Sequence, residues 1–205
     1  MKTLVIETAT EACSVALFED KRLLAGEHRM LGRGHAELLV PMISELPGKG
    51  KAERIAVSLG PGSFTGVRIG LAAARALALA WKAECLGYPT LALVAAIARE
   101  RCPGPVSVCM TGGHGEWFLQ DFADTGAPQG KLVSLPPAAA AASAAHDLVA
   151  GTQAEALVGL RNSGEAMPIW PNAGKFPLLA PMLLTAELSP IYGRGPDARL
   201  PGQAA

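Results

Sequence analysis

The sequence contains no block of like charge. Its 205 residues carry 18 basic and 18 acidic side chains, so the formal net charge at neutral pH is zero. Arms that bind nucleic acid and helices that lie on membranes depend on clustered cations. The composition therefore argues against a polybasic contact with RNA and predicts no membrane partner. Half of the residues are hydrophobic, which is enough for an ordered globular core.

Cysteine is scarce, and no cysteines or histidines occur at the spacings typical of metal sites. The four cysteines form no Cys-x-x-Cys pair and have no histidine at ligand spacing; they are Cys13, Cys85, Cys102 and Cys109. None of the four histidines has another histidine three or four residues away, which excludes a metalloprotease helix. We interpret the cysteines as reduced, mostly buried small hydrophobes, and we expect no metal site and no cofactor.

The sequence offers no signal peptide and no long apolar run. The N-terminal stretch "MKTLVIETAT" enters a strand pattern at once. The most apolar run, Ile69 to Trp81, is interrupted by Arg75 and is too short to span a bilayer. These features predict a cytoplasmic protein.

The first hundred residues alternate between strand and helix patterns. Three β-rich runs predict an antiparallel meander, and strands and helices then follow in turn. The expected strands are 3–10, 12–20, 22–30, 54–60 and 84–88, and the expected helices are 34–48, 65–82 and 89–101.

A Pro- and Gly-rich segment, Arg101 to Pro105, divides the chain, and strand patterns restart after it. The second half predicts strands at 106–110, 116–124, 131–135 and 155–160, and helices at 136–151 and 175–188. This order repeats that of the first half in degraded form. We therefore expect an α/β protein with two ribonuclease-H-like lobes, residues 1–102 and 103–205, whose tail returns towards the first lobe.

The stretch "SLGPGSFTGVRIGLA", residues 58–72, joins a strand to a helix through closely spaced glycines. Such a turn can hold an anion at the helix N-terminus. A P-loop is excluded because Val67 and Arg68 stand where Lys and Ser or Thr are required, and the glycine spacing does not fit a dinucleotide fingerprint. A strip of small residues follows at every fourth position: Gly66, Gly70, Ala74 and Ala78. The strip favours close packing of this helix, either within the protein or across an interface.

Glu7 ends the first strand and is followed by Thr8 and Thr10. An acid and hydroxyls in a strand-end turn can bind magnesium or phosphate, and they can equally be a solvated carboxylate beside turn residues. Ser63 lacks the spacing of a nucleophile elbow. We predict no catalytic residue.

Four motifs together resemble the TsaB family, also called YeaZ, of bacterial tRNA threonylcarbamoyladenosine biosynthesis. They are "LVIETATEACSVAL", "HAELLVPMI", "GPGSFTGVRIGLAAARALA" and "PIYGRGPDA". The resemblance is dense over residues 1–98, thin from about 103 to 187, and returns at Pro190 to Ala198. It implies the actin-like ATPase superfamily (ASKHA) fold with two ribonuclease-H-like lobes. It also implies a non-catalytic partner of the transferase TsaD that works with the ATPase TsaE, forms a homodimer when alone, and contacts tRNA only indirectly.

The candidate site residues fall into two sets, one for the partner that the resemblance implies and one for the alternative of nucleotide binding. The partner-binding set lies on the two N-terminal helices: His35, Leu38, Leu39, Met42, Gly66, Gly70, Ala73, Ala74, Leu77 and Ala78. The candidate nucleotide-binding set lies in and near the glycine turn: Glu7, Thr8, Thr10, Gly60, Gly62 and Ser63. TsaD binds its metal through a His-x-x-x-His pair, and residues 85–98, the equivalent stretch here, contain no histidine.

This chain departs from the family pattern at two places. Glu7 stands where relatives usually have Asp, and Thr111-Gly112-Gly113 stands where they usually have Asp-Ala-Arg. The alternatives to a scaffold are a protein of the same superfamily that binds or hydrolyses nucleotide, and a metallopeptidase. A hydrolase needs a magnesium-binding acid on each lobe, and the sequence offers only Glu7; a metallopeptidase has no ligands here.

Overall fold

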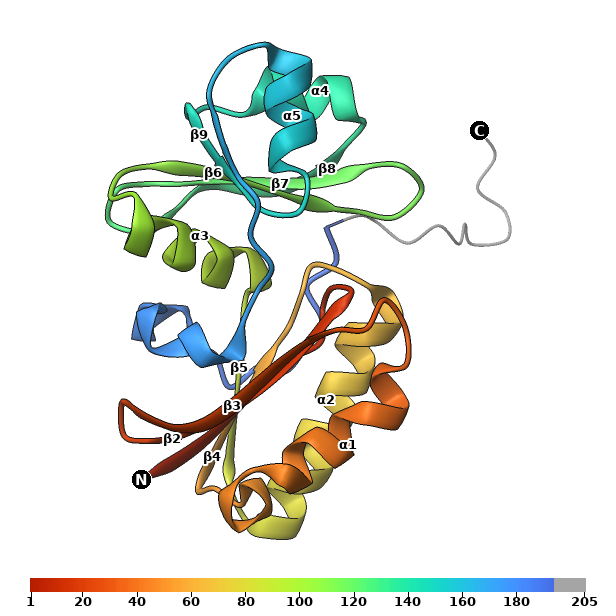
Figure 1. Ribbon diagram of the computed structural model, residues 1–205, viewed down its shortest axis with the longest axis vertical. Coiled ribbons are helices and arrows are strands. Elements are labelled where there is room, and N and C mark those ends of the chain that lie inside the picture. Colours follow the sequence, from red (N-terminus) through yellow and green to blue (C-terminus); the bar gives the residue numbers. More distant parts are fainter. Residues whose placement is uncertain (194–205) are drawn as a thin grey trace.

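The computed structural model describes residues 1–193, which form two five-stranded sheets of the same topology (Figure 1). The first sheet has the order β3-β2-β1-β4-β5, and the second has the order β8-β7-β6-β9-β10 when read in the same direction. In each, three strands form an antiparallel meander and two further strands run parallel to the first. The strands are β1 (Lys2–Glu7), β2 (Ala12–Glu19), β3 (Arg22–Met30), β4 (Arg54–Ser58), β5 (Glu84–Tyr88), β6 (Val106–Thr111), β7 (Trp117–Phe122), β8 (Pro128–Leu135), β9 (Leu148–Ala150) and β10 (Glu165–Met167). The α/β fold with two ribonuclease-H-like lobes is confirmed.

The helices lie in three layers around these sheets (Figure 1). Helices α1 (His35–Glu45) and α2 (Phe64–Trp81) cover the outer face of the first sheet, and α4 (Pro137–Ser143) and α5 (Ala154–Arg161) cover the outer face of the second. Helix α3 (Thr90–Arg101) lies between the two sheets, together with the 3-10 turns η2 (Ala173–Leu178) and η3 (Pro181–Leu183). A further 3-10 turn, η1 (Pro47–Gly50), follows α1.

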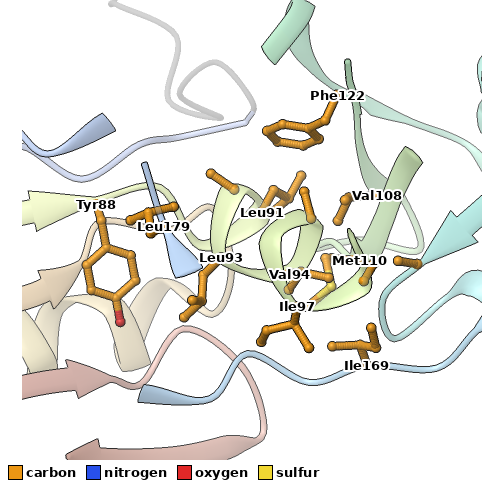
Figure 2. Close-up of a cluster of buried hydrophobic side chains, with 14 of the residues drawn as sticks. Tyr88, Leu91, Leu93, Val94, Ile97, Val108, Met110, Phe122, Ile169 and Leu179 are labelled. Carbon is orange, nitrogen blue, oxygen red and sulfur yellow. The ribbon is translucent and has the colours of Figure 1, made fainter. Parts of the chain in front are cut away.

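Helix α3 is buried on nearly all sides. Eight of its twelve residues are buried, and its sequence "TLALVAAIARER" lacks a polar face until its last turn. Such a helix is stable only between two apolar layers. Leu91, Val94 and Ile97 pack in one core cluster with side chains from both sheets, and Figure 2 shows Val108 and Phe122 of the second sheet beside them. One continuous core therefore joins the two lobes.

The segment that follows η3 crosses back to the first lobe. Thr185 forms a β-bridge with Gly87, and the Ile191 amide donates to the Leu59 carbonyl oxygen at 2.7 Å. Arg75 of α2 donates to the Leu188 carbonyl oxygen, also at 2.7 Å. Residues 188–192 therefore run along α2 from Arg75 back to Arg68, near the start of the helix. The remainder of the C-terminal motif, Arg194 to Ala198, lies outside the described residues.

Most of the expected elements are present, and three expectations in the second half are wrong. Residues 155–160 belong to helix α5, with Ala154 and Leu157 on its buried face. In a short apolar run the hydrophobic periodicity does not distinguish a strand from a buried helix. Residues 175–188 form no α-helix, because Pro177 and Pro181 restrict the chain to 3-10 turns. The alanine-rich helix ends at Ser143, before strand β9.

Within residues 1–193, α2 is the one helix long and apolar enough to cross a membrane by length and composition alone. It is longer than the apolar run from Ile69 that the sequence suggests, because it begins at Phe64. Core helices pass the same test, and α2 carries Arg68 and Arg75 and packs on β4. We therefore treat it as a helix of the first lobe.

The shared core predicts that one cavity in α3 weakens both lobes. Leu91 is completely buried, so Leu91→Ala removes about 2–5 kcal/mol from the free energy of unfolding. Met182 is exposed, and Met182→Ala is the control, with an expected change within about 0.5 kcal/mol. Urea unfolding followed by circular dichroism measures both values. Separate unfolding transitions of the two lobes in the Leu91 variant would contradict a continuous core.

Candidate functional site

The glycine turn before α2 packs against the turn between β1 and β2. The Ser63 amide donates to the Ala9 carbonyl oxygen at 2.7 Å, and a Cβ atom at Gly62 would collide with the same carbonyl group. The Ser63 hydroxyl accepts from the Gly66 amide at 3.2 Å and so caps the helix. The Gly60–Pro61 peptide bond is cis, and Gly60 has a φ of 88°. The close approach of two turns thus requires glycine here.

The small residues of α2 face the first sheet of the same chain. A Cβ atom at Gly66 would collide with the Thr8 carbonyl oxygen, and one at Gly70 would collide with the Thr8 hydroxyl. The Thr8 hydroxyl donates to the Gly66 carbonyl oxygen at 2.8 Å, and Ala74 is completely buried. The strip is therefore an internal packing face, and the expectation that it lies against another protein chain is wrong for Gly66, Gly70 and Ala74.

The structure divides the predicted partner-binding residues into two groups. His35, Leu39 and Met42 of α1 are also buried, and the His35 ring nitrogen Nε2 lies 3.3 Å from the Ala12 carbonyl oxygen. The partly exposed members of the set are Leu38, Ala73, Leu77 and Ala78. Regular spacing of small and apolar residues identifies a packing face, but it does not tell which surface the face packs against.

The outward face of α2 carries exposed alanine and leucine side chains between two exposed arginines, Arg68 and Arg75, and was not among the predicted site residues. Ala72, Ala76 and Leu79 lie on one side of the helix, at spacings of four and three residues, and all three are exposed. Leu79 is 85% exposed. Val40 of the neighbouring α1 is exposed as well. We call Ala72, Ala76 and Leu79 the outer stripe of α2.

Glu7 is completely buried at the end of β1. Its Oε1 accepts from the Ala9 amide at 2.8 Å, and its Oε2 lies 3.3 Å from the Tyr88 hydroxyl. Burial raises the pKa of Glu7 from 4.5 to about 7, and the hydrogen bond from Ala9 opposes this rise. Glu7 is thus neither a solvated carboxylate nor a group that meets a ligand in the cleft described next.

A cleft of about 710 Å³ lies between the two lobes. The β1–β2 turn, the start of α2, the β6–β7 turn and residues 191–193 contribute to its walls. Of the six residues predicted to relate to nucleotide binding, Thr10, Gly62 and Ser63 line the cleft, whereas Glu7, Thr8 and Gly60 do not. Glu7 and Thr8 are buried behind the turn, which is the physical reason for this correction.

Three side chains that the sequence analysis did not select meet at the mouth of the cleft. The Arg68 guanidinium lies 3.2 Å above the centre of the Phe64 ring, and its Nη2 donates to the Tyr192 hydroxyl at 2.7 Å. The centres of the Phe64 and Tyr192 rings are 6.3 Å apart. The signal for this cluster was the spacing of Phe64 and Arg68, one helical turn apart; the partner Tyr192 is 124 residues further on.

The segment Thr111-Gly112-Gly113, which departs from the family pattern, lines the cleft from the second lobe. The Thr111 hydroxyl lies 3.1 Å from that of Thr152 and accepts from Gln153 Nε2 at 2.8 Å. A Cβ atom at Gly112 would lie 2.6 Å from the Glu116 carbonyl oxygen, so the tight turn requires glycine there. At Gly113 a Cβ atom would meet no atom within 4 Å.

Neither the acids nor the thiols of this chain form a metal centre in the described residues. No three His, Cys, Asp or Glu side chains among residues 1–193 lie where they could hold one ion. The four cysteines are free; burial raises the pKa of Cys13 to about 11 and that of Cys109 to about 12. Cys85 and Cys102 are only partly buried.

Sequence comparison finds relatives in tRNA modification. The family model described as TsaD, tRNA N6-adenosine threonylcarbamoyltransferase, matches residues 29–127. The tRNA threonylcarbamoyladenosine biosynthesis protein TsaB of Escherichia coli is 41% identical over 100 residues, which are 46% of this chain and 43% of that protein. The protein of the same name from Haemophilus influenzae is 36% identical over 106 residues, which are 47% of this chain and 43% of that protein. These alignments span less than half the length of the relatives.

Comparison of structures extends the similarity over nearly the whole chain. A protein from Pseudomonas aeruginosa, described as similar to peptidase YeaZ, superposes with a TM-score of 0.76 at 27% identity. The superposition covers 94% of this chain and 99% of the Pseudomonas protein. Both lobes, including the second one with its weak sequence signal, therefore share the arrangement of that protein.

The packing of α2 predicts that arginine is tolerated at Ala76 but not at Ala74. Ala74→Arg places a charged side chain against the first sheet, and we expect loss of the folded state, because an unpaired buried charge and overpacking together cost several kcal/mol. Ala76→Arg, on the exposed side, is the matched control and should melt within a few degrees of the parent protein. Thermal melting of both variants gives the comparison. A well-folded Ala74→Arg protein would show that the strip is open to solvent.

The burial of Glu7 predicts a specific dependence of stability on pH. Because the folded state raises the pKa from 4.5 to about 7, the folded protein binds the proton more tightly than the unfolded chain, and stability falls as the pH rises through this interval. The loss amounts to about 3 kcal/mol and persists above pH 7. Glu7→Gln cannot ionise, so its stability should change less between pH 4.5 and 8. Urea unfolding at a series of pH values measures this dependence. The same change in the free energy of unfolding with pH in both proteins would rule out this role for Glu7.

Proposed function

Because the N-terminal lobe is similar in sequence to TsaB proteins and the whole fold is similar to that of a YeaZ-like protein, we propose that this chain is a non-catalytic subunit in tRNA threonylcarbamoyladenosine biosynthesis. In this proposal it binds TsaD and supports transfer of the threonylcarbamoyl group to the adenosine next to the anticodon. TsaE is the ATPase of the same complex, tRNA is contacted only indirectly, and the site of action is the cytoplasm.

One observation carries the proposal: α2 presents the apolar outer stripe, Ala72, Ala76 and Leu79, to solvent. The opposite face of the helix is already used for packing on the first sheet, so the stripe has no partner in the described part of this chain. Exposed apolar side chains beside charged ones, here Arg68 and Arg75, are typical of a subunit interface. TsaD is the partner we propose for this surface, with a second copy of this chain taking its place when TsaD is absent.

The chemistry of the cleft supports a non-catalytic role. Glu7, the acid at the end of β1, is buried and does not line the cleft. Glu11 is the one carboxylate among the described lining residues, and its Oε1 accepts from Trp170 Nε1 at 2.7 Å. Hydrolysis of a nucleotide in this superfamily needs an acid from each lobe, and the described lining supplies one from the first lobe alone. We therefore prefer a scaffold to a hydrolase.

The interface proposal predicts that Leu79→Arg weakens binding to TsaD. A charged side chain in the middle of an apolar contact must be desolvated without a partner, which we expect to weaken binding at least about tenfold, or about 1.4 kcal/mol. Leu160→Arg is the matched control, since Leu160 is also exposed but lies on α5 of the second lobe. Sedimentation of each variant with and without TsaD measures association, and melting confirms folding.

A modification assay with TsaD and TsaE then tests the role. Omission of this chain should abolish modification, and Leu79→Arg should restore it less well than Leu160→Arg. Equal binding of both variants to TsaD would reject the outer stripe as the interface. Transfer of threonylcarbamoyl, cleavage of peptides or robust ATP hydrolysis by the isolated chain would reject the scaffold proposal itself.

A further inference from the structure

The last residues that the structure describes, Thr185 to Gly193, form a strap that touches both lobes. They leave the layer between the sheets, pass the edge of β5, follow α2 and reach the second lobe at the cleft (Figure 1). We propose that this strap is a releasable clasp, which ties the two lobes together at the mouth of the cleft and opens as a unit while both lobes stay folded. The inference concerns the isolated chain and does not depend on binding to TsaD.

Two backbone contacts fasten the strap to the first lobe. Thr185 and Gly87 exchange both of their amide hydrogen bonds, at 3.0 and 2.8 Å. The Ile191 amide donates to the Leu59 carbonyl oxygen at 2.7 Å. The contact at Thr185 is an isolated bridge outside the named strands, so it has no neighbouring pairs of the same ladder to support it. The strap is therefore held at separate points and is not part of the sheet.

Two arginines of α2 supply the other contacts with the first lobe. Arg75 donates to the Leu188 carbonyl oxygen and Arg68 donates to the Tyr192 hydroxyl, both from Nη2 and both at 2.7 Å. The Arg68 guanidinium also lies 3.2 Å from the centre of the Phe64 ring, which orients it towards the strap. Both hydrogen bonds are exposed to solvent, where water competes for the same donors, so each one alone contributes little.

The end of the strap packs on the second lobe. A Cβ atom at Gly193 would lie 2.4 Å from the Cδ1 and Cε1 atoms of Phe118, so the strap backbone lies directly on that ring. Phe118 belongs to β7 and to the core cluster around α3, which leaves its ring little room to move away. The preceding residue, Tyr192, is bound to Arg68 of α2. The strap thus passes from one lobe to the other within two residues, and both of them line the cleft.

The strap is fastened less firmly than the core that joins the lobes. Eight of the twelve residues of α3 are buried, whereas the side chains with which the strap packs on the first lobe, Leu188 and Ile191, are only partly buried. Four strap residues are exposed: Ala186, Glu187, Ser189 and Tyr192. Segments with few buried apolar contacts and exposed hydrogen bonds open well before the whole protein unfolds. Once the strap is released, the core around α3 still joins the lobes, and the mouth of the cleft widens.

Amide hydrogen exchange of the full chain, followed by NMR, tests whether the strap opens as a unit. The Thr185 and Ile191 amides report on its two ends, and the amides of α3 report on global unfolding. We expect both strap amides to exchange through one opening, with protection factors at least about a hundredfold below those of α3.

Two variants and a control locate the contacts that hold the strap. Arg68→Gln removes a hydrogen bond at one end and should speed exchange of both strap amides about two- to tenfold. Gly193→Val places a side chain against Phe118 and should speed both further. Arg22→Gln is the matched control, because Arg22 is an exposed arginine of β3 that pairs with Glu19, and the strap amides should not respond to it. Thermal melting confirms that each variant is folded.

Spin labels on the two sides of the cleft test whether the strap ties the lobes. Thr65→Cys in α2 and Glu155→Cys in α5 place labels at exposed positions on different lobes. Cys85 and Cys102 are replaced by serine, and the two buried thiols remain unlabelled, because burial raises the pKa of each. Double electron–electron resonance should give a longer and broader distance distribution when Gly193→Val is added.

Three results would overturn the clasp. If Arg68→Gln speeds exchange of Ile191 and leaves Thr185 unchanged, the strap frays from its end and does not open as a unit. If the strap amides are protected as strongly as those of α3, the strap is part of the core. If Gly193→Val leaves the distance distribution unchanged, the strap does not tie the lobes. Because Leu79→Arg should leave exchange in the strap unchanged, failure of the clasp and failure of the TsaD interface are separate outcomes.

Discussion

Burial of helix α3 between two sheets is the constraint on which the rest of the structure depends. The helix has no polar side before its last turn, so it needs an apolar layer on each side. The first sheet supplies one of these layers, together with the 3-10 turns after Asn172, and the second sheet supplies the other. The two lobes are held together by this shared core, and the cleft lies where the core ends and the turns of both lobes face each other.

Helix α2 packs on the first sheet with one face and is exposed to solvent on the other. Its glycine and alanine face allows the backbone to approach the first sheet, because no Cβ atom stands between Gly66 or Gly70 and Thr8. Its opposite face is exposed and carries Ala72, Ala76 and Leu79 beside Arg68 and Arg75. Its first turn holds Arg68 at the cleft.

The first lobe could be predicted in detail from the sequence, and the second only in part. Strand β5 begins and ends at the expected residues, because its β-rich run is bounded by a turn and by Pro89. In the second lobe, residues 155–160 form a helix and not the expected strand. That run has only six residues, which is too short for the helical and strand periods to differ clearly. Pro177 and Pro181 prevent the α-helix that the apolar spacing of residues 175–188 predicts, and these residues form two 3-10 turns.

The sequence by itself indicated the fold class, the resemblance to the TsaB family, and the need for glycine between β4 and α2, because periodicity, motifs and turn residues are local properties. Only the tertiary structure decided which way each face points. Glu7 and Gly70 were marked by the sequence as special, but their burial depends on contacts with Tyr88 and Thr8, which are far away in the chain. Likewise, Phe64 and Arg68 contact Tyr192, which is 124 residues beyond Arg68 in the chain. Long-range contacts of this kind depend on the packing of whole layers, which no local pattern records.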